Sequence, residues 1–400
     1  MAEPRSIEGK SGYFYRIYTD LRMHHSFSDE TIENLARLSE MLKAKGTTLI
    51  YAPVPTKSQA MPEFLPDSAA LYGYTRELAV QSYQTVVDRL RAANVVAADL
   101  QSPMIAAKSH DGLFFRSDFH WTAQGARLAA EAIADVIKAQ PEYASAKKTK
   151  FKTRELESIV SFSTLRNNLQ RFCKDSLPAV ESMAYETTKA DQSSGSLDLF
   201  GAEATDPIAL VGTSMSNAEA GNFGGFISQY SSLALTNYAI SGGNQFGSIL
   251  SYMTSREFQE NRPRFLIWEN PIYNNLGQYG PAPWVELLAA ASQTCQPALE
   301  AKGLDDQPNE FVVDLTSVEV TPDQAVMVET PDQTIRDLKV DAALANGQHR
   351  TISMLRGDRL RATGRFYFPL QPLEQAPITS LKLIFDRPPE GGSELQLCSY

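Results

Sequence analysis

At 400 residues, the chain exceeds the size at which one hydrophobic core stops growing, so we expect two domains. Hydrophobic residues make up 43% and charged residues 21%, a balance that argues against a disordered or fibrous chain. The net charge of −10 argues against a nucleic-acid binder, because such proteins usually carry a basic patch. No apolar run approaches the roughly 20 residues that are needed to cross a bilayer.

The first hundred residues alternate between helical and strand patterns. Ser28 is a suitable N-cap for a helix with acidic residues in its first turn, and apolar residues follow at helical spacing up to Gly46. Residues 47–54 are β-branched and apolar, which predicts a buried strand. A second helical pattern over residues 79–90 leads into a short apolar run at residues 95–98.

The same alternation returns after a polar stretch at residues 186–206, which we expect to form an exposed loop. Three apolar runs, separated by segments of helical length, predict further strands at residues 208–211, 233–240 and 265–268. Strands that alternate with helices favour a parallel sheet that is covered on both faces. The predicted fold class of this part of the chain is therefore α/β.

The C-terminal region has a different pattern. Beyond Cys295, short apolar runs are separated by polar or Pro/Gly turns, with little helical periodicity. We expect a small all-β sandwich, built from the runs at residues 311–313, 325–328, 366–368 and 381–385. The predicted domains are residues 1–290, with the parallel sheet and its flanking helices, and residues 291–400, with the β-sandwich.

The three cysteines, Cys173, Cys295 and Cys398, lack the CxxC spacing of a zinc or redox site, so we predict no metal and no cofactor. A bridge between Cys295 and Cys398 would close a long loop and stabilise the fold by roughly 4 kcal/mol on the loop-entropy model. Such a bridge requires an oxidising compartment. The alternative is three unrelated buried thiols, because free cysteine is often simply a core residue.

Ser214 is a candidate nucleophile because of its place after a predicted strand. It follows the apolar run at residues 208–211 and Gly212, and it precedes a predicted helix. Functional loops gather at the carboxyl ends of the strands of an open parallel sheet, and the free N–H groups of a helix N-terminus stabilise developing negative charge. The same pattern also describes an ordinary helix cap, so a candidate base is needed.

His120 is the histidine with the clearest local pattern. Asp118 lies two residues before it, and Thr122 begins a helix with one apolar face. An aspartate in this position can accept a hydrogen bond from the imidazole Nδ1–H and stabilise the imidazolium that forms when Nε2 accepts a serine proton. In the alternative, Asp118 satisfies a local turn and His120 packs under Trp121. The presence of both patterns in one α/β chain favours a triad of Ser214, His120 and Asp118.

Asp-x-His together with strand-Gly-x-Ser resembles the SGNH hydrolase superfamily, in which the serine usually comes first and Asp-x-x-His comes near the end. The reversed order in this chain resembles the AlgX/AlgJ-type alginate O-acetyltransferases, which are secreted proteins with a permuted SGNH-like domain. The resemblance runs nearly end to end. It is carried by DFHWTAQG (118–125), LVGTS (210–214), NFGGF (222–226), SGG (241–243) and LIWE (266–269).

The resemblance implies that Ser214 is the nucleophile that accepts an acetyl group, that His120 is the general base, and that Asp118 orients His120. The Ser214 N–H is one candidate oxyanion donor. Gly242 or Gly243 can supply another, unless the double glycine is only a turn.

Other site residues match the family less closely. Tyr273 lies where the family has an aromatic residue near the active cleft, although it can equally be a tyrosine that packs a loop. The asparagine of the SGNH name has only two candidates, Asn244 and Asn270. The tyrosine that the family has shortly after the nucleophile is missing from residues 216–223, so we expect the substrate geometry to differ.

The resemblance also implies partners and a location. It implies that the C-terminal domain is a carbohydrate-binding module with a Cys295–Cys398 disulfide and that the polysaccharide is alginate. It further implies a membrane O-acyltransferase-type acetyl donor, an outer-membrane secretion complex and a periplasmic location. The first residues lack the regions of a secretory signal, so we expect a mature chain with an added methionine.

An acidic protein must bind an anionic polymer through local cations. Lys57, Arg116 and Arg127 lie near predicted loop ends and are candidates, although such residues are mostly ordinary surface charges.

The predicted function is therefore O-acetyl transfer through an acyl-serine intermediate to hydroxyls of an exopolysaccharide, with mannuronate residues of alginate as the acceptor. A polysaccharide acetylesterase with the same triad is the first alternative, because water rather than a sugar hydroxyl can attack the same intermediate. A non-catalytic, polymer-binding scaffold of the secretion complex is the second alternative.

Overall fold

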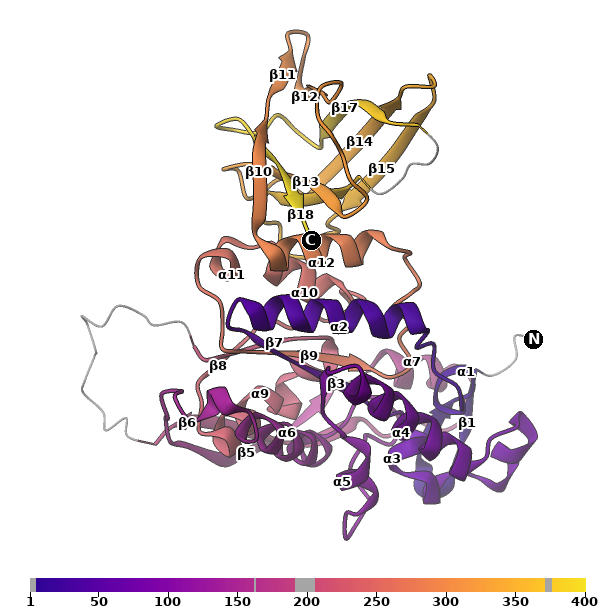
Figure 1. The fold of residues 1–400 in the computed structure, drawn as a ribbon. Coiled ribbons are helices and arrows are strands. Elements are labelled where there is room, and N and C mark those ends of the chain that lie inside the picture. Colours follow the sequence, from indigo (N-terminus) through magenta and orange to yellow (C-terminus); the bar gives the residue numbers. More distant parts are fainter. Residues whose placement is uncertain (1–4, 162, 191–205, 371–375) are drawn as a thin grey trace. The chain divides into compact units, whose positions relative to one another are not determined.

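The computed structural model describes residues 5–161, 163–190, 206–370 and 376–400, and Figure 1 shows its ribbon. The chain forms two compact units. The first consists of Met1–Ser39, Thr47–Gln245 and Pro263–Leu276, and the second of Glu40–Gly46, Phe246–Arg262 and Gly277–Tyr400. All three residues of the predicted triad belong to the first unit.

A five-stranded sheet with the order β4-β3-β9-β7-β8 forms the centre of the first unit. All four strand pairs are parallel, which confirms the predicted parallel sheet. Strands β3, β7 and β9 are buried along their whole length, as expected from their uninterrupted apolar runs. The strands are β3 (Thr48–Val54), β4 (Val96–Ala97), β7 (Ile208–Val211), β8 (Leu235–Asn237) and β9 (Phe265–Pro271).

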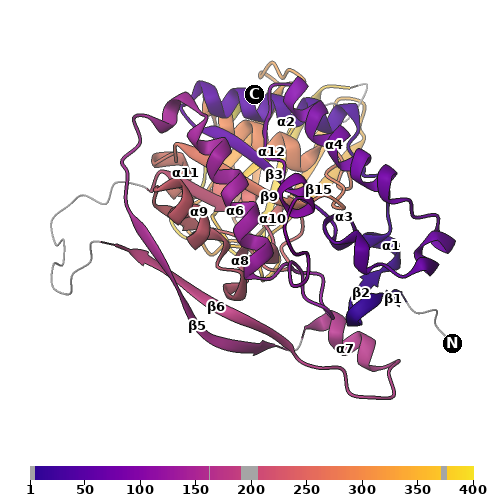
Figure 2. The same ribbon diagram turned by 90° about the horizontal axis from the view of Figure 1, so that it is seen from below.

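Helices cover the two faces of this sheet. On one face, α6 (Ala123–Lys138) and α9 (Phe223–Ser231) share a core with side chains of β3, β7 and β9. On the opposite face, Phe27, two residues before α2 (Asp29–Ala44), contacts Tyr51 of β3 edge-on at 6.1 Å between ring centroids. Figures 1 and 2 show α6 and α9 together on their side of the sheet. A further helix, α4 (Arg76–Ala92), has the apolar spacing that predicted it.

The expected strand at residues 233–240 is shorter than predicted, because its regular pairing ends at Asn237. The chain nevertheless continues beside β7. The N–H of Tyr238 donates to the carbonyl of Leu210 at 2.8 Å, and that of Ile240 donates to the carbonyl of Gly212 at 3.0 Å. These bonds carry the chain past the end of β7, toward the segment that contains Ser214.

The sequence did not predict a long antiparallel ribbon formed by β5 (Phe151–Ser161) and β6 (Val180–Lys189). Figure 2 shows this ribbon with α7 (Thr164–Gln170) at one end. The ribbon has no alternating apolar pattern. Polar cross-strand pairs help to hold it instead, such as Thr153 and Thr187, whose hydroxyl oxygens lie 2.7 Å apart. The expected loop at residues 186–206 is therefore partly strand, since residues 186–189 belong to β6; residues 191–205 lie outside the described part.

The second unit contains two antiparallel sheets, with the orders β10-β18-β13-β16 and β11-β12-β17-β14-β15. Side chains of both sheets share one apolar core, among them Val326 and Phe368 from the first sheet and Val340 and Leu383 from the second. This arrangement confirms the predicted β-sandwich. The strands are β10 (Thr294–Leu299), β11 (Ala301–Leu304), β12 (Gln307–Asp314), β13 (Gln324–Glu329), β14 (Asp337–Leu344), β15 (His349–Leu355), β16 (Arg365–Pro369), β17 (Ile378–Phe385) and β18 (Glu394–Ser399).

The second unit also includes α10 (Gly247–Met253), α11 (Arg256–Glu260), α12 (Ala282–Ser292) and the last residues of α2. On α12, the buried carboxylate of Glu286 pairs with Arg356 and accepts the N–H of Tyr367 at 3.4 Å. The division into domains at residue 290 stays a prediction.

Cys295 and Cys398 form a disulfide between β10 and β18, where the two residues are direct cross-strand partners. The predicted bridge is confirmed, and the alternative of three unrelated thiols is wrong. Cys173 is a free, half-buried thiol of the first unit.

We predict that the double variant Cys295→Ala/Cys398→Ala lowers the stability of the second unit by about 5 kcal/mol, because the bridge closes a loop of 103 residues. Hydrogen exchange of peptides from β13 and β18 across a urea series measures this loss. Cys173→Ala is the matched control and leaves the exchange unchanged. Equal midpoints for the double variant and the parent would contradict the prediction.

Candidate active site

Ser214 begins the short helix α8 (Ser214–Asn217) at the carboxyl end of β7. The helix cap is Thr213, whose hydroxyl accepts the N–H of Met215 at 3.2 Å. The strand-Gly-Thr-Ser pattern therefore does contain a cap, but the residue before Ser214 supplies it. This arrangement leaves the Ser214 hydroxyl available to a partner from another loop.

A buried carboxyl group, Glu269 at the end of β9, holds the turn around Ser214. It accepts the N–H of Thr213 at 2.8 Å and the hydroxyl of Ser216 at 2.9 Å. Gly212 makes this approach possible, because a Cβ there would lie 2.5 Å from Glu269 Oε2. Burial raises the pKa of Glu269 to about 7, and the hydrogen bonds from Thr213 and Ser216 oppose that rise.

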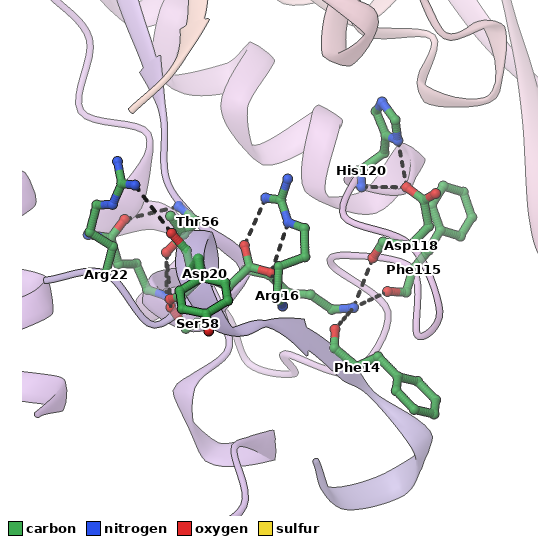
Figure 3. Close-up of polar contacts among 12 residues, drawn as sticks. Phe14, Arg16, Asp20, Arg22, Thr56, Ser58, Phe115, Asp118 and His120 are labelled. Carbon is green, nitrogen blue, oxygen red and sulfur yellow. Dashed lines mark hydrogen bonds and ion pairs between the residues drawn. The ribbon is translucent and has the colours of Figure 1, made fainter. Parts of the chain in front are cut away.

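The imidazole of His120 lies between Ser214 and Asp118. Its Nε2 is 2.7 Å from Ser214 Oγ, and its Nδ1 is 2.5 Å from Asp118 Oδ1. The same carboxylate oxygen accepts the backbone N–H of His120 at 2.7 Å, so one bond from the ring and one from the backbone hold His120 to the aspartate (Figure 3). When Nδ1–H donates to Asp118, Nε2 is left as the acceptor for the serine hydroxyl. The structure thus brings the three predicted residues together.

The charge of Asp118 suits this arrangement. Burial raises the pKa of this carboxyl group. The hydrogen bonds from His120 and Ser163, together with the charge of His120, lower the pKa by more than burial raises it. The net pKa lies below the usual value, so Asp118 is ionised at neutral pH. An ionised carboxylate next to Nδ1 stabilises an imidazolium.

Trp121 ties the histidine loop to α8. Its indole Nε1–H donates to the carbonyl of Met215 at 2.9 Å, and its ring lies 4.8 Å from that of Phe223. The alternative in which His120 packs under Trp121 is wrong, because the imidazole stacks instead on Phe119, with 4.2 Å between centroids. The loop of residues 118–121 is therefore fixed to α8 through Trp121 as well as through His120.

Tyr273 is connected to the histidine through a column of planar groups. The Arg16 guanidinium lies 4.4 Å from the ring centroid of Phe119 and 4.7 Å from that of Tyr273. Two hydrogen bonds from Arg16 to Asp20, at 3.2 and 2.9 Å, hold the guanidinium in place (Figure 3). Burial raises the pKa of Tyr273, and the charge of Arg16 partly opposes this rise.

The double glycine forms a turn beside α8. Gly242 has a left-handed φ of 73°, and the N–H of Gly243 donates to the carbonyl of Ile240 at 3.3 Å. Asn217, on the last turn of α8, donates to the hydroxyl of Ser241 at 3.0 Å. The N–H of Gly243 is used within the turn, so the role of either glycine as an oxyanion donor stays a prediction.

The two asparagine candidates lie on either side of this region. Asn244 continues the double-glycine turn with a left-handed φ of 57°. Asn270 is buried next to Glu269 on β9, and its side-chain oxygen accepts from Asn274 at 2.6 Å. Its amide nitrogen has no acceptor in the described ranges. The role of either asparagine as the superfamily's oxyanion donor stays a prediction.

The three candidate cations are already engaged. Arg127 stacks on Tyr185 and Phe226, at 5.2 and 4.9 Å from the ring centroids. Arg116 lies 3.4 Å from Asp111. The expectation for Lys57 is wrong, because its side chain is buried and its ammonium group cannot reach an external polymer.

Sequence reasoning missed Glu269, Arg16 and Asp20 as site residues. The signal for Glu269 was present, because an acidic residue directly follows the apolar run at residues 265–268 in a strand that is buried along its whole length. Arg16 and Asp20 gave no comparable signal, since their one-turn spacing is common on exposed helices.

A parallel sheet with a serine after one strand, and with a histidine of an earlier loop at hydrogen-bond distance from it, is the arrangement expected of an SGNH hydrolase-like domain of permuted order. Comparison with known families agrees with this class. The chain belongs to the AlgX family, because residues 7–272 match the family described as "SGNH hydrolase-like domain, acetyltransferase AlgX".

Individual relatives cover most of the chain. "Alginate biosynthesis protein AlgX" of Pseudomonas aeruginosa is 30% identical over 371 residues, which cover 91% of this chain and 77% of the relative. "Probable alginate O-acetylase AlgJ" of Pseudomonas putida is 30% identical over 275 residues, which cover 64% of this chain and 68% of the relative. The solved structure of Pseudomonas aeruginosa AlgX matches with a TM-score of 0.82 and 25% identity, and covers 98% of this chain and 93% of that one.

We predict that Glu269 makes the fold less stable as the pH rises. The folded state holds the Glu269 proton more tightly than the unfolded state does, because the pKa is raised from 4.5 to about 7. The stabilisation is complete below about pH 4.5 and falls by roughly 3 kcal/mol as the pH rises through 7.

Urea unfolding of the parent and of Glu269→Gln between pH 4.5 and 8 measures this effect. Glutamine keeps the shape and an acceptor for Thr213 but does not titrate. The difference in unfolding free energy between the two proteins therefore changes with pH in this window. A constant difference would show that Glu269 does not titrate with a raised pKa.

Proposed function

We propose that the protein is an O-acetyltransferase that transfers acetyl groups, through an acyl-Ser214 intermediate, to hydroxyls of mannuronate residues in alginate. The observation that carries the proposal is the hydrogen-bonded series from Asp118 through His120 to Ser214, with 2.7 Å between Nε2 and Oγ. Membership of the AlgX family and the names of the relatives support the reaction and the substrate.

In the proposed first step, Ser214 Oγ attacks the carbonyl carbon of the donor acetyl group while His120 Nε2 accepts the serine proton. The bond between the acetyl carbonyl and the donor oxygen breaks, and His120 returns the proton to that leaving oxygen. In the second step a sugar hydroxyl attacks the acyl-serine and gives its proton to His120. Ser214 leaves and recovers the proton. Asp118 stabilises the imidazolium in both steps.

The negative charge that develops on the carbonyl oxygen needs N–H donors in both steps. We assign the backbone N–H of Ser214 as one donor and Gly242 or Gly243 as the source of a second. In this proposal Tyr273 borders the substrate. The side chains of Arg16 and Phe119 lie between it and His120.

Transfer rather than hydrolysis requires a sugar hydroxyl held near the acyl-serine in place of water. We assign this holding role to residues 291–400 as a carbohydrate-binding module. The donor in this proposal is a membrane O-acyltransferase-type protein, and the acceptor polymer passes through an outer-membrane secretion complex.

We place the protein in the periplasm. The Cys295–Cys398 disulfide supports this location, because disulfides persist in oxidising compartments. Within the described ranges, none of the helices has the length and apolar character to span a bilayer.

Purified protein incubated with a small acetyl ester and oligomannuronate is expected to add acetyl groups to the oligosaccharide, as measured by mass spectrometry. Ser214→Ala abolishes the gain, and Asp118→Asn lowers kcat by about 10⁴-fold, because the imidazole loses its orienting charge. Ser82→Ala, on α4 and outside the site, is the control and retains transfer. Acetate release without transfer would identify an esterase, and full activity of Ser214→Ala would exclude the triad.

A further inference from the structure

Lys57 occupies an unusual position for a lysine. It begins the helix α3 (Lys57–Ala60) just after the carboxyl end of β3, and Thr56 and Gln59 form a capping box around that start. Its side chain is only 1% exposed. A buried lysine is costly unless its ammonium group is fully satisfied, so its contacts decide what it does.

The ammonium group is surrounded by backbone carbonyl oxygens. Nζ lies 3.0 Å from the carbonyl of Phe14, 2.5 Å from Phe115, 2.9 Å from Arg116 and 2.9 Å from Asp118. In Figure 3, dashed lines from the labelled residues Phe14, Phe115 and Asp118 converge on one nitrogen. Four acceptors converge on a group with three N–H donors.

No carboxylate of the described residues lies within 4 Å of this ammonium group to form an ion pair with it. The rings of Tyr13 and Tyr15 lie 5.2 and 5.5 Å from Nζ. Carbonyl oxygens replace water around monovalent cations in the same way in ion-selective sites. The arrangement is therefore that of a monovalent cation in a carbonyl cage, with the cation tethered to the chain.

The cage has a direct link to the site, because three of its four carbonyls belong to residues 115–118. Asp118 contributes its carbonyl to Lys57 and its carboxylate to His120. The N–H of Phe115 donates to the carbonyl of His120 at 3.1 Å, and the N–H of Phe14 donates to the carbonyl of Arg116 at 2.8 Å. The ammonium group thus draws together a loop that carries two residues of the triad.

We propose that Lys57 is a positioning residue, whose ammonium group acts as an internal cation that folds residues 115–118 around itself and so holds His120 in line with Ser214. Without the cation, the four carbonyl oxygens would each lose the hydrogen bond from the ammonium group, and the loop would open. The expected loss of activity rests on the proposed acetyl transfer, but the expected displacement of His120 does not.

Lys57→Ala tests the proposal, because it leaves a cage that matches a propylammonium ion in length and charge. The variant is expected to lose about 100-fold in kcat with a small change in KM, the effect of a catalytic group displaced by about 1 Å. Propylammonium chloride is expected to restore activity, whereas 1-propanol, of similar shape but uncharged, is not. Lys57→Met, which fills the space without charge, is the matched control and gains nothing from propylammonium.

A second readout does not depend on the reaction. Proton NMR of the parent is expected to show the strongly hydrogen-bonded His120 Nδ1–H as a downfield signal that Asp118→Asn removes. Lys57→Ala and Lys57→Met are expected to lose this signal while circular dichroism shows the native fold, and propylammonium is expected to restore it in Lys57→Ala alone.

Three results would overturn the inference. These are a native signal and native activity in Lys57→Met, a folded Lys57→Ala that propylammonium does not restore, or failure of both variants to fold, which would make Lys57 a folding residue. If the parent shows the NMR signal and propylammonium restores that signal in Lys57→Ala, but the parent transfers no acetyl group, the proposed function fails and the positioning role stands.

Discussion

The 2.7 Å contact between His120 Nε2 and Ser214 Oγ is the constraint on which the rest of the first unit depends. The two residues come from loops 94 positions apart, so their meeting requires each loop to be held from outside. Glu269 holds the serine turn through Thr213 and Ser216. On the other side, Trp121 ties the histidine loop to α8. The hydrogen-bonded series of Asp118, His120 and Ser214 therefore depends on contacts that lie beside it.

Glu269 and Lys57 are ionisable groups that are buried away from water. Such burial is costly in free energy. Glu269 responds with a pKa raised to about 7, because its hydrogen bonds only partly offset burial. Burial lowers the pKa of Lys57 to about 7, and the charges of Asp20 and Asp118 oppose that shift. Such groups make the surrounding loops specific in geometry at some cost in stability, a common feature of functional sites.

Sequence patterns were sufficient for the elements whose signal is local. The apolar runs of β3, β7 and β9 predicted the parallel sheet, and the spacing of Asp118 and His120 predicted their hydrogen bond. The β5–β6 ribbon was missed because polar cross-strand pairs, which have no period in the sequence, help to hold it. Lys57 looked like a surface cation because its partners, 43 to 61 residues away, become its neighbours only in the folded chain. Glu269 was part of a recognised motif, but its role depends on Thr213, 56 residues away.

The central claim is that His120 activates Ser214 as a nucleophile, and trapping the acyl intermediate tests it most directly. The protein is mixed briefly with a small activated acetyl ester, quenched in acid and digested for peptide mass spectrometry. We expect one acetyl group on the peptide that contains Ser214, formed far more slowly in His120→Ala. An acetyl group on another residue, or equal rates of Ser214 acetylation in the parent and in His120→Ala, would contradict it.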